Sequence, residues 1–164
     1  MKALEYENAP LKDEVIDRIA SVIGEGKITK GERTIITPAT EADVCAAVKA
    51  VIAAKGSINS KVAKHCGEND VVLDMSMMKA IESIDIVNMT AKVQVGCKID
   101  DLINAVWEKG FTLGVIPGGK DATVEDWIYT ETPGIGSYKY GTVKDNVFNV
   151  YAVDCNGACI ETGY

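Results

Sequence analysis

Hydrophobic positions recur with the period of an α-helix in several stretches of the chain. Between residues 11 and 23 they line one helical face, and Gly24 is placed to end that helix. A second helix is expected after Thr40, whose side chain is a good N-cap with Asp43 three residues further on. The pattern therefore predicts two amphipathic helices in the first third of the chain.

Short apolar runs between these helices predict strands. Residues 34–36 and 61–64 read as two strands on either side of the second helix, and residues 71–74 as a third. The run at 71–74 is apolar without alternation, which is typical of a strand covered on both faces. The order strand, helix, strand predicts parallel pairing of 34–36 with 61–64 through a right-handed crossover.

The second half has a different rhythm and ends in a hairpin. Its predicted elements are strands at 84–87 and 91–95, a helix from 99 to 110, a strand at 112–116, a short helix capped by Thr123 and a hairpin at 147–160. Asn156-Gly157 is a strong two-residue hairpin turn. In that register Cys155 faces Ala158 and Asp154 faces Cys159, so the two thiols point to opposite faces.

Composition narrows the function classes. The 164 residues carry a formal net charge of −7, and the only arginines are Arg18 and Arg33. A nucleic-acid partner is excluded because binding needs a basic face. No apolar stretch is long enough to span a membrane, and the acidic N-terminus does not read as a secretory signal. We therefore expect a cytoplasmic protein.

The reactive side chains form no recognisable catalytic or metal constellation. Five cysteines without a secretory signal argue against a disulfide framework. His65, the one histidine, makes no Cys/His zinc spacing and has no nucleophile paired with it in the sequence. We predict no metal site and assign no catalytic residue within the chain.

An ordered series of short motifs runs from residue 37 to 163. The pieces are Thr37-Pro38-x-Thr40-Glu41-x-Asp43-Val44, Val71-Val72-Leu73-Asp74-Met75-Ser76-Met77-Met78, Val93-Gln94-Val95-Gly96-Cys97, Pro117-Gly118, Thr123-Val124, Gly136-Ser137-x-x-Tyr140-Gly141-x-x-x-Asp145-Asn146-Val147 and Val153-Asp154-x-Asn156-Gly157. In order and spacing this series resembles the FAD-binding domain of the vanillyl-alcohol oxidase and p-cresol methylhydroxylase (PCMH-type) family. The branch it is most similar to contains glycolate oxidase and D-lactate dehydrogenase.

The resemblance implies an α+β fold with a single two-lobed FAD-binding domain over residues 1–164. The lobes would cover about 33–75, a small parallel βαβ lobe, and about 80–164, a larger mixed-sheet lobe with flanking helices; the N-terminal helix would be 11–23. FAD would be the cofactor and a 2-hydroxy acid the substrate class. The flavin-lining positions implied are Gly96, Pro117, Gly118, Thr123, Gly136, Ser137, Tyr140 and Gly141. Glycines allow backbone N–H groups to approach a pyrophosphate, which agrees with this assignment.

The sequence departs from the family pattern in two places. Relatives carry a loop of the form Arg-Gly-Gly-Gly-Thr-Ser before the third strand, whereas residues 64–70 here contain one glycine and two carboxylates. Relatives also carry Thr-Ile-Gly-Gly where this chain has Thr123-Val124-Glu125-Asp126, which adds negative charge near the expected phosphates.

A third difference concerns a cap domain that in relatives supplies the catalytic His and the substrate-binding Arg. The resemblance therefore implies an incomplete oxidoreductase component that is not active alone and needs a substrate/cap-domain subunit or a homo-oligomer. Two hypotheses remain: an FAD-binding module of a split flavin-dependent oxidoreductase, or a degenerate relative that no longer binds FAD and serves as an interaction or small-ligand scaffold.

Overall fold

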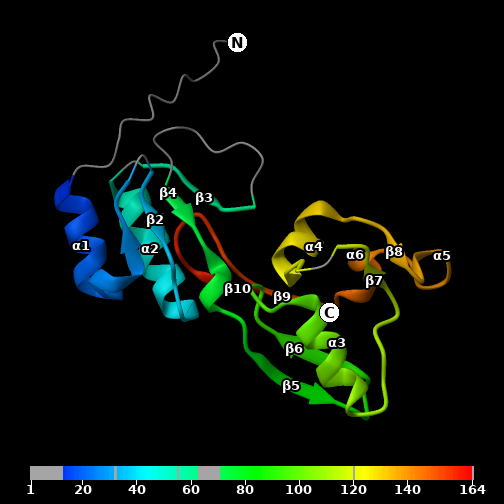
Figure 1. The fold of residues 1–164 in the computed structure, drawn as a ribbon. Helices are drawn as coiled ribbons and strands as arrows, with labels where there is room; N and C mark the ends of the chain where they lie inside the picture. The colour runs from blue at the N-terminus through cyan, green and yellow to red at the C-terminus, as the bar shows by residue number, and fades with distance from the viewer. Residues whose placement is uncertain (1–12, 32, 55, 63–70, 120, 164) are drawn as a thin grey trace. The chain divides into compact units, whose positions relative to one another are not determined.

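The chain folds into two compact units (Figure 1). The computed structural model describes residues 13–31, 33–54, 56–62, 71–119 and 121–163. Unit 1 runs to Asp74 and includes residues 152–160, and unit 2 contains residues 75–151 and 161–164. Helices, parallel strands and antiparallel strands all occur, so the α+β class predicted from the sequence is confirmed.

Unit 1 contains a four-stranded sheet with two helices. The helical elements are α1 (Asp13–Ile23), the 3-10 turn η1 (Glu25–Lys27) and α2 (Glu41–Ala53), and the strands are β1 (Ile28–Thr29), β2 (Ile35–Ile36), β3 (Ile58–Ser60) and β4 (Val71–Leu73). The strand order is β1-β2-β4-β3. Strands β2 and β3 both run parallel to β4, while β1 is antiparallel to β2.

The predicted direct pairing of the first two strands is wrong, although both lie in one sheet. β4 lies between β2 and β3, because its three residues are buried and need a neighbour on each edge. The strand expected at 61–64 is found at 58–60. Lys61 and Val62 instead begin a turn, and residues 63–64 lie outside the described part of the chain.

The core of unit 1 is aliphatic. α1 packs beside α2; α2 begins directly after Thr40 and α1 ends at Ile23, as the sequence predicted, while the predicted first residues of α1, 11 and 12, lie outside the described residues. Thr40 and Asp43 form a reciprocal capping box at the start of α2, and Lys27 pairs with Asp43 at 2.7 Å. The buried side chains are Ile16, Ile19, Ile23, Ile36, Val44, Ala47, Val48, Val51, Val71, Val72 and Leu73. Burying each larger aliphatic side chain contributes roughly 1.5–3 kcal/mol, so this cluster stabilises the unit mainly through the hydrophobic effect.

Unit 2 is built from short elements and two-stranded sheets. In chain order they are η2 (Met75–Met77), β5 (Ile81–Asp85), β6 (Thr90–Val93), α3 (Ile99–Trp107), β7 (Ile116–Pro117), α4 (Val124–Thr130), β8 (Gly134–Ile135), α5 (Ser137–Tyr140) and α6 (Val143–Asn146). The closing strands β9 (Asn149–Val153) and β10 (Cys159–Gly163) belong partly to unit 2 and partly to unit 1, which includes residues 152–160. The sheets pair β5 with β6, β7 with β8, and β9 with β10. The strand predicted at 112–116 is reduced to β7, because its partner β8 is itself only two residues long.

The closing hairpin has a longer turn than the sequence predicted. The N–H of Asp154 donates to the carbonyl of Ala158 at 2.9 Å, which leaves three residues in the loop rather than two. The predicted pairs Cys155–Ala158 and Asp154–Cys159 are therefore wrong. The side chain of Asp154 explains the change, since its Oδ1 accepts from the backbone N–H groups of Asn156 and Ala158.

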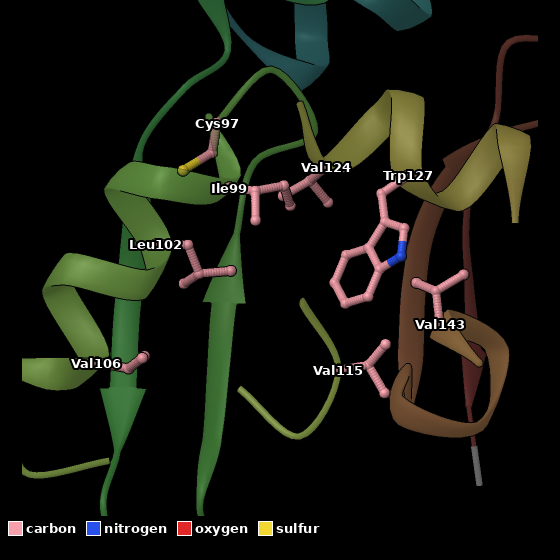
Figure 2. Packing of buried hydrophobic residues seen from close by; sticks show 8 residues of the cluster. All are labelled: Cys97, Ile99, Leu102, Val106, Val115, Val124, Trp127 and Val143. Atoms are coloured by element: carbon pink, nitrogen blue, oxygen red, sulfur yellow. The ribbon is translucent and has the colours of Figure 1, made fainter. Parts of the chain in front are cut away.

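A single cluster of buried residues forms the core of unit 2 (Figure 2). The indole of Trp127, from α4, lies near Val115 and Val143, while α3 contributes the aliphatic side chains of its buried face. The cluster comprises Cys97, Ile99, Leu102, Val106, Val115, Val124, Trp127 and Val143. In the described residues the search for membrane spans finds no helix that is long and apolar enough to qualify.

Candidate flavin-binding site

Gly96 lies in a turn where two backbone segments approach each other closely. Its N–H donates to the carbonyl of Met78 at 2.8 Å, and an added Cβ would overlap the carbonyl of Met75. The residue is buried, so a larger side chain cannot turn toward solvent. Glycine is therefore required at position 96 by the packing of unit 2 itself.

Thr123 is held beside this turn by backbone hydrogen bonds. The N–H of Val124 donates to the carbonyl of Cys97 at 2.9 Å, and the N–H of Glu125 donates to the carbonyl of Val95 at 2.8 Å. Two of the predicted site residues, Gly96 and Thr123, are thus brought together although they lie 27 positions apart in the sequence.

The start of α4 is closed by a capping box. Oγ1 of Thr123 accepts from the N–H of Asp126 at 3.1 Å, and Oδ2 of Asp126 accepts from the N–H and the hydroxyl of Thr123 at 3.0 and 2.8 Å. The Asp126 carboxylate is therefore turned back onto its own helix cap. Its negative charge is compensated there by two hydrogen-bond donors and the positive end of the helix.

A second group of predicted residues meets at the β7–β8 pair. Pro117 is opposite Gly134, and the N–H of Gly134 donates to Oγ of Ser137 at 2.8 Å. Gly136 has a positive φ of 95°, and an added Cβ would overlap the carbonyl of Gly114. Pro117, Gly136 and Ser137 are consequently fixed relative to one another by a tight backbone crossing that only glycine permits.

Tyr140 and Gly141 follow directly on this crossing. The N–H of Gly141 donates to the carbonyl of Ser137, and the side-chain amide of Asn146 donates to the carbonyls of Tyr140 and Thr142 at 2.9 and 2.7 Å. Asn146 is a positioning residue that was quoted in the motif but not assigned to the site. The signal that could have found it is the Thr-x-x-Asp capping pattern immediately before it.

Gly118 differs from the other glycines of the site. No atom of the described residues lies within 4 Å of an ideal Cβ built there, and the residue is exposed. Ile135 and Tyr138 are also exposed, by 78% and 107%. Packing within unit 2 thus does not require glycine at position 118. The exposed apolar side chains of Ile135 and Tyr138 belong to β8 and α5 of the same unit. Open backbone and apolar surface of this kind fit a large, partly aromatic cofactor.

Three charged side chains near the site have pKa values that are shifted by their hydrogen-bond partners. The pKa of Lys98 is raised by its hydrogen bond to Asp121, and the pKa of Asp145 is lowered by the backbone N–H of Thr142. The pKa of Lys139 is raised by its contact with Tyr140. Each of these shifts favours the charged form, so Lys98, Asp145 and Lys139 are charged near neutral pH.

Residues 64–70, the counterpart of the relatives' Gly-rich loop, lie outside the described residues. Within the described ranges, no group of three or more His, Cys, Asp or Glu side chains is placed to hold a metal ion.

Comparison with known proteins gives the family. The model of an FAD binding domain family matches residues 33–163, and the chain belongs to this family. Its cofactor is FAD, and the comparisons support FAD binding over the hypothesis of a scaffold that has lost it. The resemblance to the vanillyl-alcohol oxidase and p-cresol methylhydroxylase flavoproteins is confirmed.

Curated relatives are flavin-linked oxidoreductases that are much longer than this chain. The FAD-linked oxidoreductase YgcU of Escherichia coli K12 is 42% identical over 55% of this chain and 19% of its own length. The glycolate oxidase subunit GlcD of Bacillus subtilis is 33% identical over 73% and 26%, and the D-lactate dehydrogenase of Archaeoglobus fulgidus is 31% identical over 58% and 21%. The chain thus corresponds to between a fifth and about a quarter of each of these proteins.

Solved structures share the fold at lower identity. An alkyldihydroxyacetonephosphate synthase superposes with a TM-score of 0.80 at 20% identity, covering 99% of this chain and 39% of that one. A 4-ethylphenol oxidase from Gulosibacter chungangensis superposes with a TM-score of 0.74 at 16% identity, covering 92% and 34%. At these identities the likeness concerns the fold alone.

Proposed function

We propose that the chain supplies the FAD-binding part of an oxidoreductase that acts on 2-hydroxy acids. The observation that carries this proposal is the pair of backbone crossings in unit 2, at Gly96–Thr123 and at Pro117–Gly136, whose predicted residues come together in the family's order. The similarity to a glycolate oxidase subunit and a D-lactate dehydrogenase supports the substrate class.

The eight predicted residues have three kinds of role in this proposal. Gly96, Gly136 and Gly141 allow close backbone packing, whereas the exposed Gly118 leaves its backbone open to the cofactor. Thr123 caps α4 and keeps the Asp126 carboxylate away from the cofactor phosphates. The remaining positions hold the β7–β8 segment in place: Ser137, Tyr140 and the buried Pro117.

FAD, when bound, supplies the hydride acceptor for oxidation of an alcohol carbon, and the protein positions it. The residues of this chain bind and orient the cofactor and exclude water from one side of it. The exposed Tyr138 and Ile135 are suited to that exclusion, because apolar side chains lower the local dielectric around a planar ring system.

We further propose that the substrate site is completed by a substrate/cap-domain subunit or by another copy of the chain, as in a multi-subunit cytoplasmic oxidoreductase, with residues 1–164 acting as one FAD-binding domain. The relative from Bacillus subtilis is named as a subunit of a glycolate oxidase, which supports a second component. Exposed apolar side chains such as Phe148 and Ile135 support an assembly, since such surface is commonly covered by a partner.

The test compares the isolated chain with the complex purified from its native cells. Each is loaded with FAD and mixed without oxygen with D-lactate or glycolate, with propionate as the control acid that lacks a hydroxyl. We expect the complex to lose the visible absorption of oxidised flavin with the hydroxy acids only, and the isolated chain to lose it only with dithionite. A complex that holds FAD but reacts with neither hydroxy acid would contradict the substrate class. Rapid reaction of the isolated chain would contradict the need for a partner.

A further inference from the structure

Two cysteines that are distant in the sequence meet in unit 1. Cys45 lies in the first half of α2 and is buried, whereas Cys159 is the first residue of β10 and is exposed. Their sulfur atoms are 2.7 Å apart, and both are free thiols. The sequence did not indicate this contact, because 114 positions separate the two residues and hairpin spacing directed attention to Cys155 and Cys159 instead.

The contact follows from how the hairpin turn packs on α2. An ideal Cβ at Gly157 would overlap the side chain of Lys49 and would lie 2.9 Å from the carbonyl oxygen of Cys45. Gly157 is buried, and the charge of Lys49 acts on Asp154 in the same turn. The carboxylate of Asp154 holds the turn itself by accepting hydrogen bonds from two backbone N–H groups. The approach of the two sulfur atoms is therefore built into the fold of unit 1.

We propose that Cys45 and Cys159 form a redox-modifiable dithiol that closes to a disulfide when the protein meets a hydroperoxide. The first step oxidises one thiol to a sulfenic acid and reduces the peroxide O–O bond, releasing one water when the oxidant is hydrogen peroxide. In the second step the other sulfur attacks the sulfenic sulfur, the S–S bond forms, the S–O bond breaks and a second water leaves. Two thiols and one peroxide thus give one disulfide and two waters.

The electrostatic environment of Cys159 makes its oxidation slow, so the disulfide is not present at all times. The hydrogen bond with Cys45 and the neighbouring carboxylate of Glu41 raise the pKa of Cys159 to about 12. Cys159 therefore remains a thiol at neutral pH, and since thiolates are the reactive species, oxidation requires excess peroxide. In a reducing compartment the disulfide is transient, as for other redox-sensing pairs.

A disulfide here has a defined structural consequence. Residues 152–160, the tip of the hairpin, belong to unit 1, while the outer ends of β9 and β10 belong to unit 2. The covalent bond fixes the tip on α2 and removes its freedom to detach. Oxidation of the dithiol therefore reduces the mobility of residues 152–160, the part of unit 1 that follows residues 75–151 in the sequence.

The test treats the folded chain with excess hydrogen peroxide, alkylates the remaining thiols, digests the protein and identifies linked peptides by mass spectrometry. The variants are Cys159→Ser, and Cys155→Ser as the matched control in the same hairpin. We expect a Cys45–Cys159 peptide in the wild-type chain and in Cys155→Ser, its loss in Cys159→Ser, and its disappearance after dithiothreitol. The oxidised wild-type chain should also melt several degrees higher than the reduced chain.

The proposal is overturned if Cys155–Cys159 is the main linked peptide. It is also overturned if Cys45 and Cys159 both remain free to alkylate under conditions that oxidise Cys155, which is exposed. Both outcomes are read from the wild-type chain and do not depend on whether a variant folds. Neither outcome bears on FAD binding, which is measured separately.

Discussion

The two units reach a stable fold by different means. Unit 1 buries an aliphatic cluster between a four-stranded sheet and two helices, and its described core residues are branched aliphatics, alanine, one proline and one cysteine. Unit 2 contains the two-stranded sheets β5–β6 and β7–β8 and a core with one tryptophan, and its segments are fixed by helix caps and by glycines at backbone crossings. All eight predicted flavin-lining residues lie in unit 2. The difference indicates that the stability of unit 1 depends mainly on the burial of side-chain volume, and that of unit 2 mainly on backbone geometry.

Substitutions in the two cores should show the largest difference in the free energy of unfolding between the two units. Ile36 in unit 1 is completely buried, so Ile36→Ala is expected to lower the free energy of unfolding by about 2–5 kcal/mol. Trp127→Phe in unit 2 should cost less, since the buried indole N–H has no hydrogen-bond partner among the described residues and its removal offsets part of the lost packing. Urea unfolding measures both. A cost for Trp127→Phe as large as that for Ile36→Ala would show that the N–H is bonded in solution.

Glycine substitutions test the claim that unit 2 depends on backbone geometry. Gly96→Ala places a methyl group against the carbonyl of Met75 and should destabilise the protein by about 1–3 kcal/mol. Gly26→Ala in unit 1 is the matched control, because nothing lies within 4 Å of its Cβ and its φ is not positive. Thermal unfolding followed by circular dichroism compares them. Equal melting temperatures for the two variants would contradict the close approach at Gly96.

The two capping boxes allow one interaction to be removed from each unit. Thr40→Ala and Thr123→Ala each remove an N-cap hydroxyl that accepts from the third helical residue, and each should cost about 0.5–2 kcal/mol. Only Thr123→Ala should also weaken FAD binding, because it removes one of the two donors that hold the Asp126 carboxylate at the start of α4, beside the proposed cofactor site. Fluorescence titration with FAD distinguishes the two. An equal loss of FAD affinity in both variants would mean that the effect is general destabilisation.

The smallest expected effect concerns how the free energy of unfolding changes at acidic pH. Burial acts to raise the pKa of Asp43, but hydrogen bonds from Lys27, Ala39 and Thr40 outweigh it and lower the pKa overall. A carboxyl whose pKa is lower when folded contributes stability above its unfolded pKa of about 3.9, and this stability is lost as the pH falls through the folded pKa. Asp43→Asn should therefore flatten the dependence of unfolding free energy on pH below about 4. A slope identical to that of the wild-type chain would exclude this contribution.

The sequence predicted the elements that depend on local signals. The helices at α1, α2, α3 and α4 follow from periodicity and caps, and Thr40 and Thr123 were identified as N-caps from spacing alone. The central position of β4 was not predicted, because strand order depends on which apolar run the rest of the sheet must cover.

The candidate site was predicted from the order and spacing of short motifs along the sequence, and not from contacts between residues in space. Which of its glycines are demanded by packing, as at Gly96 and Gly136, and which leave open backbone, as at Gly118, depends on contacts between residues far apart in the chain. The hairpin register was missed for a related reason, since the Asp154 side chain competes with the two-residue turn that Asn156-Gly157 favours. The Cys45–Cys159 contact has no local signal.

The central claim is that the open backbone at Gly118 belongs to the FAD-binding surface of unit 2. The most direct measurement titrates FAD into the wild-type chain and into Gly118→Val, following the quenching of flavin fluorescence. Because no atom of the described residues lies within 4 Å of the new Cβ, we expect an unchanged melting temperature in the absence of FAD and an affinity for FAD that is about tenfold or more weaker. Equal FAD affinity in the two proteins would contradict the placement of the cofactor at this surface.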